Sequence, residues 1–553
     1  MRQAYRQPKP NCYRLSKGIR VTLQGEAGLA ICAYPLRIVR VSTTAASLLQ
    51  CCQDERTCEE LAAHLQLPRQ RVQTLCEQLC AKGLLEAGPM LPPATWPHVS
   101  IIIPTHNRAN QLERCLRSLY VLEYPIASLE ILIVNDASTD ETTTMLQRLI
   151  KETAIPIRVL SHTTQQGVAI CRNDGAEAAC STLLAYIDSD CVASPAWLKE
   201  LVPVFQHAHV AAVGGMIRAY ERESMLGRYE DVRSSLFMGN RPQQVSPGGP
   251  LQYLPTANFL VRRELWQQLG GFAPLSFGED VDFCRRLLAH NVHILYVPQG
   301  IVYHDYRTKL PAFLRIRASY ASAEAALLQR HPEERRVLLL PPEQASFAGL
   351  VVGGLWGCVL AYIGSIHSLP RRKVPVKGTP TMDAGFVVHG KGTPRGYPVV
   401  GGKEWARMIS LLCLTIALLL SLWGAWRRWQ RVRRRRVPLG PLAVLRATIR
   451  GNLAYTYHLA RHLTHYYTLP LLLVGLVLPP LLVLVFILMG IVIGVDYVRL
   501  RPDMRLGAYA WCALLDDCAY EVGVVQGCIQ HRTWKPLWPI IRKKPTIPDG
   551  SSH

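Results

Sequence analysis

Three short apolar runs, each ending in polar side chains, constrain the fold of this chain more than any other feature. The runs, each with the residue that ends it, are Val99–Pro104 with Thr105, Leu129–Val134 with Asp136, and Leu183–Ile187 with Asp188. Apolar residues at helical spacing separate the first two runs, and a second helical pattern at 144–150 and another strand-like run at 155–160 follow. This alternation predicts an α/β fold, with a mostly parallel sheet and helices on both faces.

The carboxyl ends of the predicted strands form the first candidate site. In open α/β sheets, ligands bind beyond the carboxyl ends of the strands, where Thr105, Asp136 and Asp188 all fall. Asp188 and Asp190 are separated by one residue, so both can reach a single divalent cation from the loop after the strand. Mg²⁺ and Mn²⁺ take carboxylate oxygens together with substrate phosphates. A strand followed by a polar turn is the alternative, and the two neighbouring strand ends favour the metal site.

Five motifs in a fixed order carry a resemblance to a known family. They are Pro104-Thr-His-Asn-Arg108, Val134-Asn-Asp-Ala-Ser-Thr-Asp140, Gly167-Val-Ala-Ile-Cys-Arg-Asn173, Asp188-Ser-Asp190 and Gly278-Glu-Asp-Val-Asp-Phe-Cys-Arg285. From about Val99 to His304 the chain resembles the family 2 glycosyltransferases with the GT-A fold. The resemblance implies transfer of a sugar from a nucleotide-sugar donor, with a Mg or Mn divalent cation as cofactor.

The resemblance implies roles on the donor side. The residues implied to bind the donor are Thr105, Asn107, Asp136, Arg172 and Asp188. Asp136 would accept from the N3–H of a uracil-type base, and Arg172 would offer its guanidinium to the diphosphate. An exposed helix arginine is the alternative for Arg172. Asp188 and Asp190 would hold the metal, which neutralises the leaving diphosphate.

Further roles concern the acceptor side. Asp280 would take the proton of the acceptor hydroxyl as general base, with Glu279 shaping its surroundings. A base on one face of the sugar and a metal-bound leaving group on the other imply inversion at the anomeric carbon. Asn258 is a candidate acceptor contact, and His304 a candidate for completing the metal site. A loop asparagine bonded to its own backbone and a surface histidine are the alternatives.

Two other enzyme classes fit the motifs less well. Phosphatases of the haloacid dehalogenase type also place D-x-D after a strand, but after the first strand of the domain and followed by Thr. Dinucleotide-binding dehydrogenases need G-x-G-x-x-G after a strand, and no such motif follows Ile103, Val134 or Ile187.

The first ninety residues predict a separate small domain. Short strands are expected from Val21 to Arg40, a helix opening with the capping box Thr57-Cys-Glu-Glu60, a second helix after Pro68, and a wing-like strand at Leu84. This winged-helix pattern resembles the peptide-binding chaperone domain of pyrroloquinoline-quinone biosynthesis (PqqD-like). Such a domain binds a leader peptide by adding a strand to its sheet edge. Only a mild excess of basic residues lies on its second helix, so no nucleic-acid partner is expected.

The C-terminal third predicts membrane attachment. Apolar spans are expected at 347–366, 408–426 and 470–495, the last of them a span or a re-entrant hairpin broken at Pro479-Pro480. Glycines repeat every four residues in the first span, at Gly349, Gly353 and Gly357, as in closely packed membrane helices. Residues 367–407 read as a basic loop rich in Gly and Pro, and 427–469 as a basic cytoplasmic segment. Asp516 and Asp517 are expected on a solvated face of the amphipathic tail, 496–553.

Charge and cysteine content agree with this division. Residues 367–553 hold 26 Lys and Arg and 8 Asp and Glu, which places 18 of the net charge of +22 in the C-terminal third. This placement favours a membrane lipid surface as partner. The 17 cysteines contain no C-x-x-C pair, so no metal-ligand pairing is expected among them. Cys58, Cys76 and Cys80 lie at apolar helical positions, which favours buried, reduced thiols in a cytosolic domain. We expect no secretory signal, since the opening residues Met1–Arg6 lack an apolar region. We therefore expect a multi-pass protein of the cytoplasmic membrane, with the catalytic domain, residues 97–330, facing the cytoplasm.

A PqqD-like module at 1–90, a family 2 transferase and a membrane tail together resemble the glycosyltransferases of the mycofactocin system. That resemblance implies transfer of a hexose, most simply glucose from UDP-glucose, to a peptide-derived redox cofactor or its precursor peptide. Two alternatives remain. One is a transferase for cell-envelope polysaccharide or lipid-linked sugar, and the other is a non-catalytic, membrane-tethered peptide-binding protein.

Overall fold

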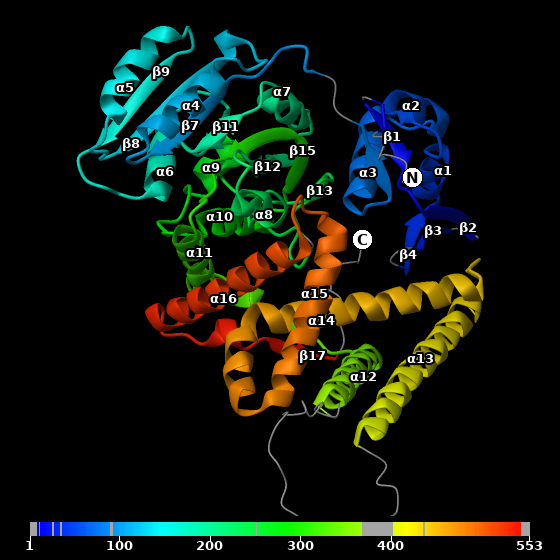
Figure 1. The fold of residues 1–553 in the computed structure, drawn as a ribbon. Helices are drawn as coiled ribbons and strands as arrows, with labels where there is room; N and C mark the ends of the chain where they lie inside the picture. Colours follow the sequence, from blue (N-terminus) through cyan, green and yellow to red (C-terminus); the bar gives the residue numbers. More distant parts are fainter. Residues whose placement is uncertain are drawn as a thin grey trace, which may run out of the picture. The chain divides into compact units, whose positions relative to one another are not determined.

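The computed structural model describes residues 8–9, 11–24, 27–33, 36–88, 92–249, 251–367, 402–434 and 437–543. The predicted loop at 367–407 and the last ten residues of the predicted tail therefore lie largely outside the described residues. The chain forms two compact units: one contains Met1–Val337 and Asp496–Ile540, and the other contains Leu338–Val495 and Ile541–His553. Figure 1 shows the course of the chain through its elements.

The N-terminal module combines two small sheets with three helices. Strands β2 (Ile19–Gln24), β3 (Ala27–Ala33) and β4 (Leu36–Ser42) form an antiparallel sheet, and β1 (Cys12–Leu15) lies between β5 (Arg56–Thr57) and β6 (Leu85–Ala87). The helices are α1 (Thr43–Cys51), α2 (Cys58–Leu65) and α3 (Arg69–Ala81). The predicted capping box is confirmed: Thr57 Oγ1 accepts from the Glu60 amide, and Glu60 accepts from the Thr57 amide. Helix α1 was not expected from the sequence.

The central sheet of the first unit positions the candidate site. Its order is β11-β15-β12-β14-β10-β7-β8-β9, and β13 pairs with β15. The strands are β7 (Val99–Thr105), β8 (Leu129–Asp136), β9 (Ile157–His162), β10 (Leu183–Ile187), β11 (Cys191–Ala193), β12 (Val210–Ala219), β13 (Gln243–Gln244), β14 (Asn258–Arg262) and β15 (His293–His304). Strands β7, β8, β9 and β10 are parallel, as the alternation of strand and helix predicted. The other half is mixed, because β14 runs antiparallel to both β10 and β12.

Helices cover both faces of this sheet, and each face has its own apolar core. One core joins alternate strand residues such as Ile101 and Ile103 to helices α4 (Ala109–Leu119), α5 (Thr142–Leu149) and α7 (Trp197–Leu201). The other joins Ile102 to α6 (Val168–Ala178), α9 (Arg263–Gln268) and α10 (Glu279–Ala289). Since successive strand side chains point to opposite faces, the sheet forms the middle layer of an α/β sandwich. Strand β15 runs to His304, and its pairing with β12 is irregular between Val297 and Ile301.

The C-terminal helix α16 (Leu506–Gln530) belongs to the first unit and packs along α11 (Leu310–Arg330). The two backbones approach closely, since a Cβ at Gly523 would collide with the main-chain oxygen of Ala318. Asp516 accepts a hydrogen bond from Tyr229 of helix α8 (Met225–Arg233) at 2.9 Å and pairs with Arg317 at 3.1 Å. The expectation of a solvated acid pair was wrong, because these partners take both Asp516 oxygens.

The second unit is helical. Its helices are α12 (Pro342–His367), α13 (Gly402–Arg434), α14 (Pro441–Val477) and α15 (Pro479–Leu500), the last of which continues into the first unit. Among the described helices, α13 and α15 are long and apolar enough to cross a membrane. Only 28% and 22% of their most apolar windows are buried within the chain. Helix α12, over the first expected span, is not among them. The expected break at Pro479 is present between α14 and α15.

Candidate active site

The ends of β7, β8 and β10 bring the predicted donor residues to one edge of the sheet. Thr105 ends β7, Asp136 ends β8 and Asp188 follows β10, and parallel pairing puts these ends side by side. The Thr105 hydroxyl is buried and has no hydrogen-bond partner among the described residues. A buried hydroxyl without a partner costs free energy, so it is suited to a ligand that reaches this edge.

Asp136 is held as a carboxylate by several donors. Its Oδ1 accepts from the amide of Gln166 at 2.8 Å and lies 2.8 Å from His162 Nδ1, while its Oδ2 accepts from the amide of Gly167 at 2.9 Å. Burial alone would raise the pKa of Asp136, but these hydrogen bonds outweigh it and lower the pKa. Asp136 therefore faces the site ionised and able to accept a hydrogen bond.

Asn107 stabilises the loop that follows Asp136. It has a positive φ of 51°, and its Oδ1 accepts from the amides of Thr139 at 2.7 Å and Asp140 at 3.3 Å. Asn107 therefore holds residues 138–140 against the end of β7, and its contact with the nucleotide-sugar stays a prediction.

Asp190 is 4% exposed and has two arginines near one of its carboxylate oxygens. Arg108 donates to its Oδ2, and Arg307 lies 3.4 Å from the same oxygen. His304 Nε2 lies 3.6 Å from Oδ1, which has no hydrogen-bond partner among the described residues. These cationic neighbours outweigh burial and lower the pKa of Asp190. The carboxylate Oδ1, together with His304, fits a divalent cation, and ligand atoms of Asp190, Cys191 and His304 lie within 4.8 Å of one another.

Arg172 links Asp188, which follows β10, to Glu279, which begins α10. Its Nη2 donates to Asp188 at 2.7 Å and its Nη1 to Glu279 at 2.5 Å, and its side chain is 4% exposed. The two carboxylates raise the pKa of Arg172, so the guanidinium stays charged despite its burial. The solvated-helix alternative for Arg172 does not hold. In this geometry Arg172 fixes the distance between two acidic segments that are 91 positions apart in sequence.

Asp280 begins helix α10 beside this bridge. Burial and the negative charge of Glu279 raise the pKa of Asp280 to about 8. The amide of Val281 donates to its Oδ1 at 2.8 Å, and no other hydrogen bond to this carboxylate is present among the described residues. A carboxylate with a raised pKa and a free oxygen has the properties of a general base that works near neutral pH.

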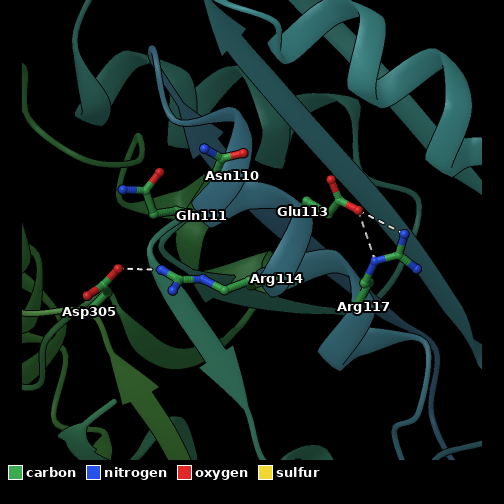
Figure 2. A pocket seen from close by; sticks show the side chains of 6 residues that line it. All are labelled: Asn110, Gln111, Glu113, Arg114, Arg117 and Asp305. Carbon is green, nitrogen blue, oxygen red and sulfur yellow. Dashed lines mark hydrogen bonds and ion pairs between the residues drawn. The ribbon is translucent and has the colours of Figure 1, made fainter. Parts of the chain in front are cut away.

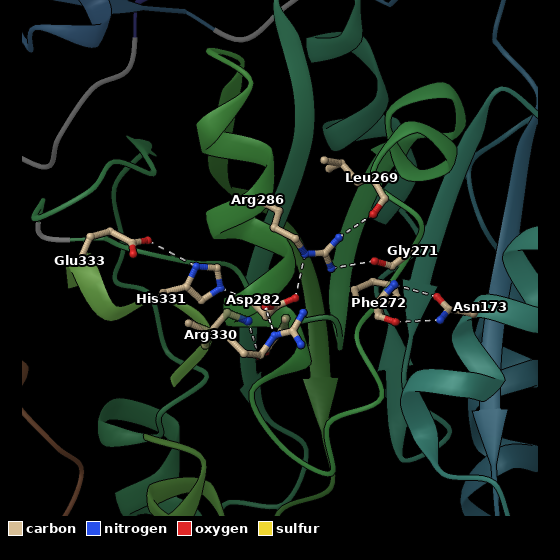
Figure 3. Close-up of polar contacts among 11 residues, drawn as sticks. Asn173, Leu269, Gly271, Phe272, Asp282, Arg286, Arg330, His331 and Glu333 are labelled. Carbon is tan, nitrogen blue, oxygen red and sulfur yellow. Dashed lines mark hydrogen bonds and ion pairs between the residues drawn. The ribbon is translucent and has the colours of Figure 1, made fainter. Parts of the chain in front are cut away.

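A polar network around Asp282, two residues after Asp280 in α10, anchors this helix (Figure 3). Asp282 is fully buried and accepts from Arg330 at 2.7 Å, from Arg286 at 2.8 Å and from His331 at 2.9 Å. Arg286 also donates to the carbonyls of Leu269 and Gly271, at 2.9 and 2.7 Å. In the same view, Asn173 of the Gly167–Asn173 motif bonds both backbone groups of Phe272. The loop before α10 is therefore fixed from two directions.

Asn258 differs from its expected role. It is fully buried, its Oδ1 accepts from Trp197 Nε1 at 2.8 Å, and its Nδ2 donates to the carbonyls of Met216 and Gly300 at 3.1 and 2.9 Å. These bonds use both donors and one acceptor position of the amide. Asn258 therefore ties β14 to β12 and β15, and its burial leaves no contact for an acceptor.

An open hollow adjoins the metal side of the site (Figure 2). Arg114 reaches from α4 to pair with Asp305, whose amide donates to the Asp190 carbonyl at 2.9 Å. The other residues that line the hollow all belong to α4: Asn110, Gln111, Glu113 and Arg117. The hollow contains none of the predicted site residues, so it borders the candidate centre without being part of it.

Three residues of this edge were missed from the sequence: Arg108, Arg307 and His162. Arg108 stands inside the quoted Pro104–Arg108 motif, which could have indicated it. Arg307 and His162 carry no local signal, because only the fold brings them to Asp190 and Asp136.

Comparison with known proteins supports a single class. Residues 100–270 match the model of glycosyl transferase family 2. The pre-mycofactocin glycosyltransferase of Mycobacterium tuberculosis is 28% identical over 338 residues, which is 60% of this chain and 66%, just under two thirds, of the relative. The glycosyltransferase AglE of Haloferax volcanii is 29% identical over 217 residues, covering 39% of this chain and 69% of the relative.

Solved structures are more distant. The mannosyltransferase PcManGT of Pyrobaculum calidifontis, in complex with GDP-Man and Mn²⁺, is 18% identical and covers 66% of this chain and 89% of its own, with a TM-score of 0.35. Staphylococcus aureus TarS 1-349 in complex with UDP-GlcNAc is 19% identical and covers 40% of this chain and 65% of its own, with a TM-score of 0.33. These sequence matches agree with one another: residues 100–270 match the glycosyl transferase family 2 model, and 60% of the chain is similar to a glycosyltransferase.

Proposed function

We propose that the chain is an inverting, metal-dependent glycosyltransferase that moves glucose from UDP-glucose to a peptide-derived redox cofactor of the mycofactocin type. The observation that carries the chemistry is the Arg172 bridge, which holds Asp188 of the metal pair and Glu279 beside Asp280 in one constellation. The similarity to the pre-mycofactocin glycosyltransferase supports the acceptor class.

The proposed reaction is a single displacement. Asp280 takes the proton of an acceptor hydroxyl, the oxygen bonds to the anomeric carbon, and the bond from that carbon to the diphosphate oxygen breaks. Asp188, Asp190 and His304 would hold a Mg²⁺ or Mn²⁺ ion, which supplies charge neutralisation for the leaving diphosphate. Arg108 and Arg307 meanwhile keep Asp190 ionised. Attack from the side opposite the leaving group inverts the anomeric configuration.

The N-terminal module is proposed to recognise the peptide from which the acceptor derives. Among the described residues, β2 and β4 are the edge strands of the β2-β3-β4 sheet. A peptide strand can add to such an edge. The exposed apolar helices α13 and α15 are proposed to hold the enzyme at the cytoplasmic membrane, with the donor site facing the cytoplasm.

A second candidate is transfer to a lipid acceptor. The beta-monoglucosyldiacylglycerol synthase of a Nostoc strain is 28% identical over 196 residues, and the exposed apolar helices would bring a lipid acceptor close. The non-catalytic alternative is less well supported, because it does not account for the raised pKa of Asp280 or for the buried Asp190 Oδ1 that has no hydrogen-bond partner among the described residues.

The test uses full-length, detergent-solubilised protein with Mn²⁺. UDP-glucose and GDP-mannose are offered separately, each without an acceptor, with the peptide-derived mycofactocin precursor, or with diacylglycerol, and nucleotide release is measured. We expect UDP release that rises only with this acceptor. Release that rises only with diacylglycerol would favour the lipid candidate, and no release with any combination would contradict transferase activity.

A further inference from the structure

A histidine outside the five motifs lies between two carboxylates at the proposed base-binding end of the donor site. His162 is the last residue of β9, which pairs with β8 so that His162 stands directly opposite Asp136. Its Nδ1 lies 2.8 Å from Asp136 Oδ1, and its Nε2 lies 2.8 Å from Asp174 Oδ2. Asp174 comes from α6, the helix that also supplies Arg172.

This geometry specifies the charge state of the ring. A neutral imidazole has one N–H and can donate to one of two carboxylates, whereas an imidazolium donates to both. Asp136 is kept ionised by the amides of Gln166 and Gly167, so His162 Nδ1, 2.8 Å from its Oδ1, must carry a proton, because a bare ring nitrogen would face an anionic oxygen. Both short distances are satisfied together only by the imidazolium.

The other groups around the ring do not oppose this charge. The Cys171 thiol lies 3.9 Å from His162 Nδ1, and burial with the nearby Asp136 charge raises its pKa to about 12, so it stays neutral. On the third side, His106 contacts the main-chain oxygen of Asp136 and not its carboxylate. The His162 side chain is 16% exposed, so water screens the two ion pairs only partly.

We propose that His162 positions Asp136 for the donor nucleobase, and that it does so as an imidazolium ion bridging Asp136 and Asp174. This inference rests on the proposed nucleotide-sugar function and adds to it a residue that none of the motifs contains. Loss of the proton breaks one of the two hydrogen bonds and removes a positive charge beside a site for an anionic donor. Both effects weaken donor binding.

The direction of the pH dependence follows. Burial alone would lower the pKa of His162, but the hydrogen bonds and charges of Asp136 and Asp174 raise it above its ordinary value. The imidazolium is therefore present at low pH and is lost as pH rises through the raised pKa. Donor affinity should fall on the alkaline side, whereas a step that needs deprotonated Asp280 improves there. Binding and turnover thus change in opposite directions.

The experiment measures UDP-glucose affinity calorimetrically on the full-length protein with Mg²⁺, from about pH 6 to about pH 8.5, since the diphosphodiester of this donor does not titrate in that range. In the native protein we expect Kd to rise with pH above the His162 pKa, by up to about tenfold per pH unit. His162→Gln keeps a neutral amide and should show weaker affinity with little pH dependence. Asp174→Asn should bind normally at low pH, with the rise in Kd beginning at lower pH.

His98→Gln is the matched control, because His98 is exposed at the opposite end of β7, and it should behave as the native protein does. A native Kd independent of pH, or a pH dependence unchanged in both His162→Gln and Asp174→Asn, would overturn the role of His162 while leaving the donor site intact. Absence of UDP-glucose binding by the native protein at every pH would instead overturn the proposed function. If His162→Gln fails to fold, the shift expected in Asp174→Asn decides alone.

Discussion

At the scale of single residues, the site contains carboxylates with opposite pKa shifts. The pKa of Asp280 is raised, and the pKa of Asp190 is lowered. Asp280 has one backbone donor and a negative neighbour, whereas Asp190 has Arg108 and Arg307. One carboxylate is thereby suited to accept a proton and the other to remain an anion. This difference in environment, and not the residue type, separates the proposed base from the proposed metal ligand.

Asp280→Asn removes the proposed base while preserving the side-chain shape. We expect kcat to fall by about 10²–10⁴-fold, because the acceptor hydroxyl loses its proton acceptor. UDP-glucose affinity should stay within about twofold, since Asp280 is proposed to act on the acceptor and not to hold the donor. Turnover measured as UDP release, together with calorimetric binding, checks both parts. Native turnover in this variant would eliminate Asp280 as the base.

The pH dependence of turnover follows from the same residue. Asp280 must be deprotonated to act, and its pKa is raised to about 8, so kcat should rise with pH and level off above about 8. Glu279→Gln removes a negative charge that contributes to this shift, so the midpoint should move to lower pH. The measurement is kcat at saturating donor and metal across pH. A midpoint that moves upward in Glu279→Gln would contradict this electrostatic account.

Asp190→Ala tests the metal site. We expect loss of Mn²⁺ binding, measured by electron paramagnetic resonance, and loss of the metal dependence of UDP-glucose affinity. Asp305→Ala is the control, since Asp305 is next to His304 in sequence but pairs with Arg114 on the hollow of Figure 2. Equal Mn²⁺ binding by both variants would place the metal site elsewhere.

At the scale of elements, the sequence predicted the parallel half of the sheet well and the other half poorly. Strands β7, β8 and β10 are continuous apolar runs that end in polar residues, so local pattern alone identifies them and the donor edge. Strand β15 contains Pro298 and Gly300, which read locally as a turn; its pairing with β12 is irregular between Val297 and Ile301 and then resumes to His304. Asn258 and Asp516 were misjudged because their partners are distant in sequence.

The close packing of α16 on α11 can be tested with a matched pair of glycines. A Cβ at Gly523 meets the backbone of Ala318, whereas a Cβ at Gly507, in the first turn of the same helix, meets nothing within 4 Å. We expect Gly523→Ala to destabilise the first unit by about 1–3 kcal/mol through overpacking. Gly507→Ala should be neutral or stabilise by up to about 1 kcal/mol.

Thermal unfolding of the two glycine variants in the same detergent gives the comparison. Equal melting temperatures would mean that α16 does not depend on this close approach. Loss of activity in Gly523→Ala at temperatures below its unfolding would additionally link the docking of α16 to the geometry of the site.

At the scale of the whole molecule, chain connectivity restricts how the second unit can cross a membrane. The chain leaves the first unit after Val337 and returns to it at Asp496, and α16 then packs on α11. Both segments must lie on one side, so the number of crossings between them is even. Three full crossings, the simplest reading of the apolar spans at 347–366, 408–426 and 470–495, are therefore excluded for a chain whose catalytic unit is folded.

Two arrangements have an even number of crossings. They differ in the side of the membrane on which residues 437–440 lie, just after the arginine-rich end of α13. If α13 and α15 cross, this segment lies opposite the catalytic unit. If α12 and α13 cross and α15 is re-entrant, it lies on the catalytic side, as the preference of arginine for the cytoplasmic face favours. We expect epitope tags at both ends of this chain and at Gly440 to be digested together in inverted membrane vesicles and protected in right-side-out vesicles. Protection of the Gly440 tag alone in inverted vesicles would favour crossing by α13 and α15, and end tags on opposite sides would contradict the docking of α16 on α11.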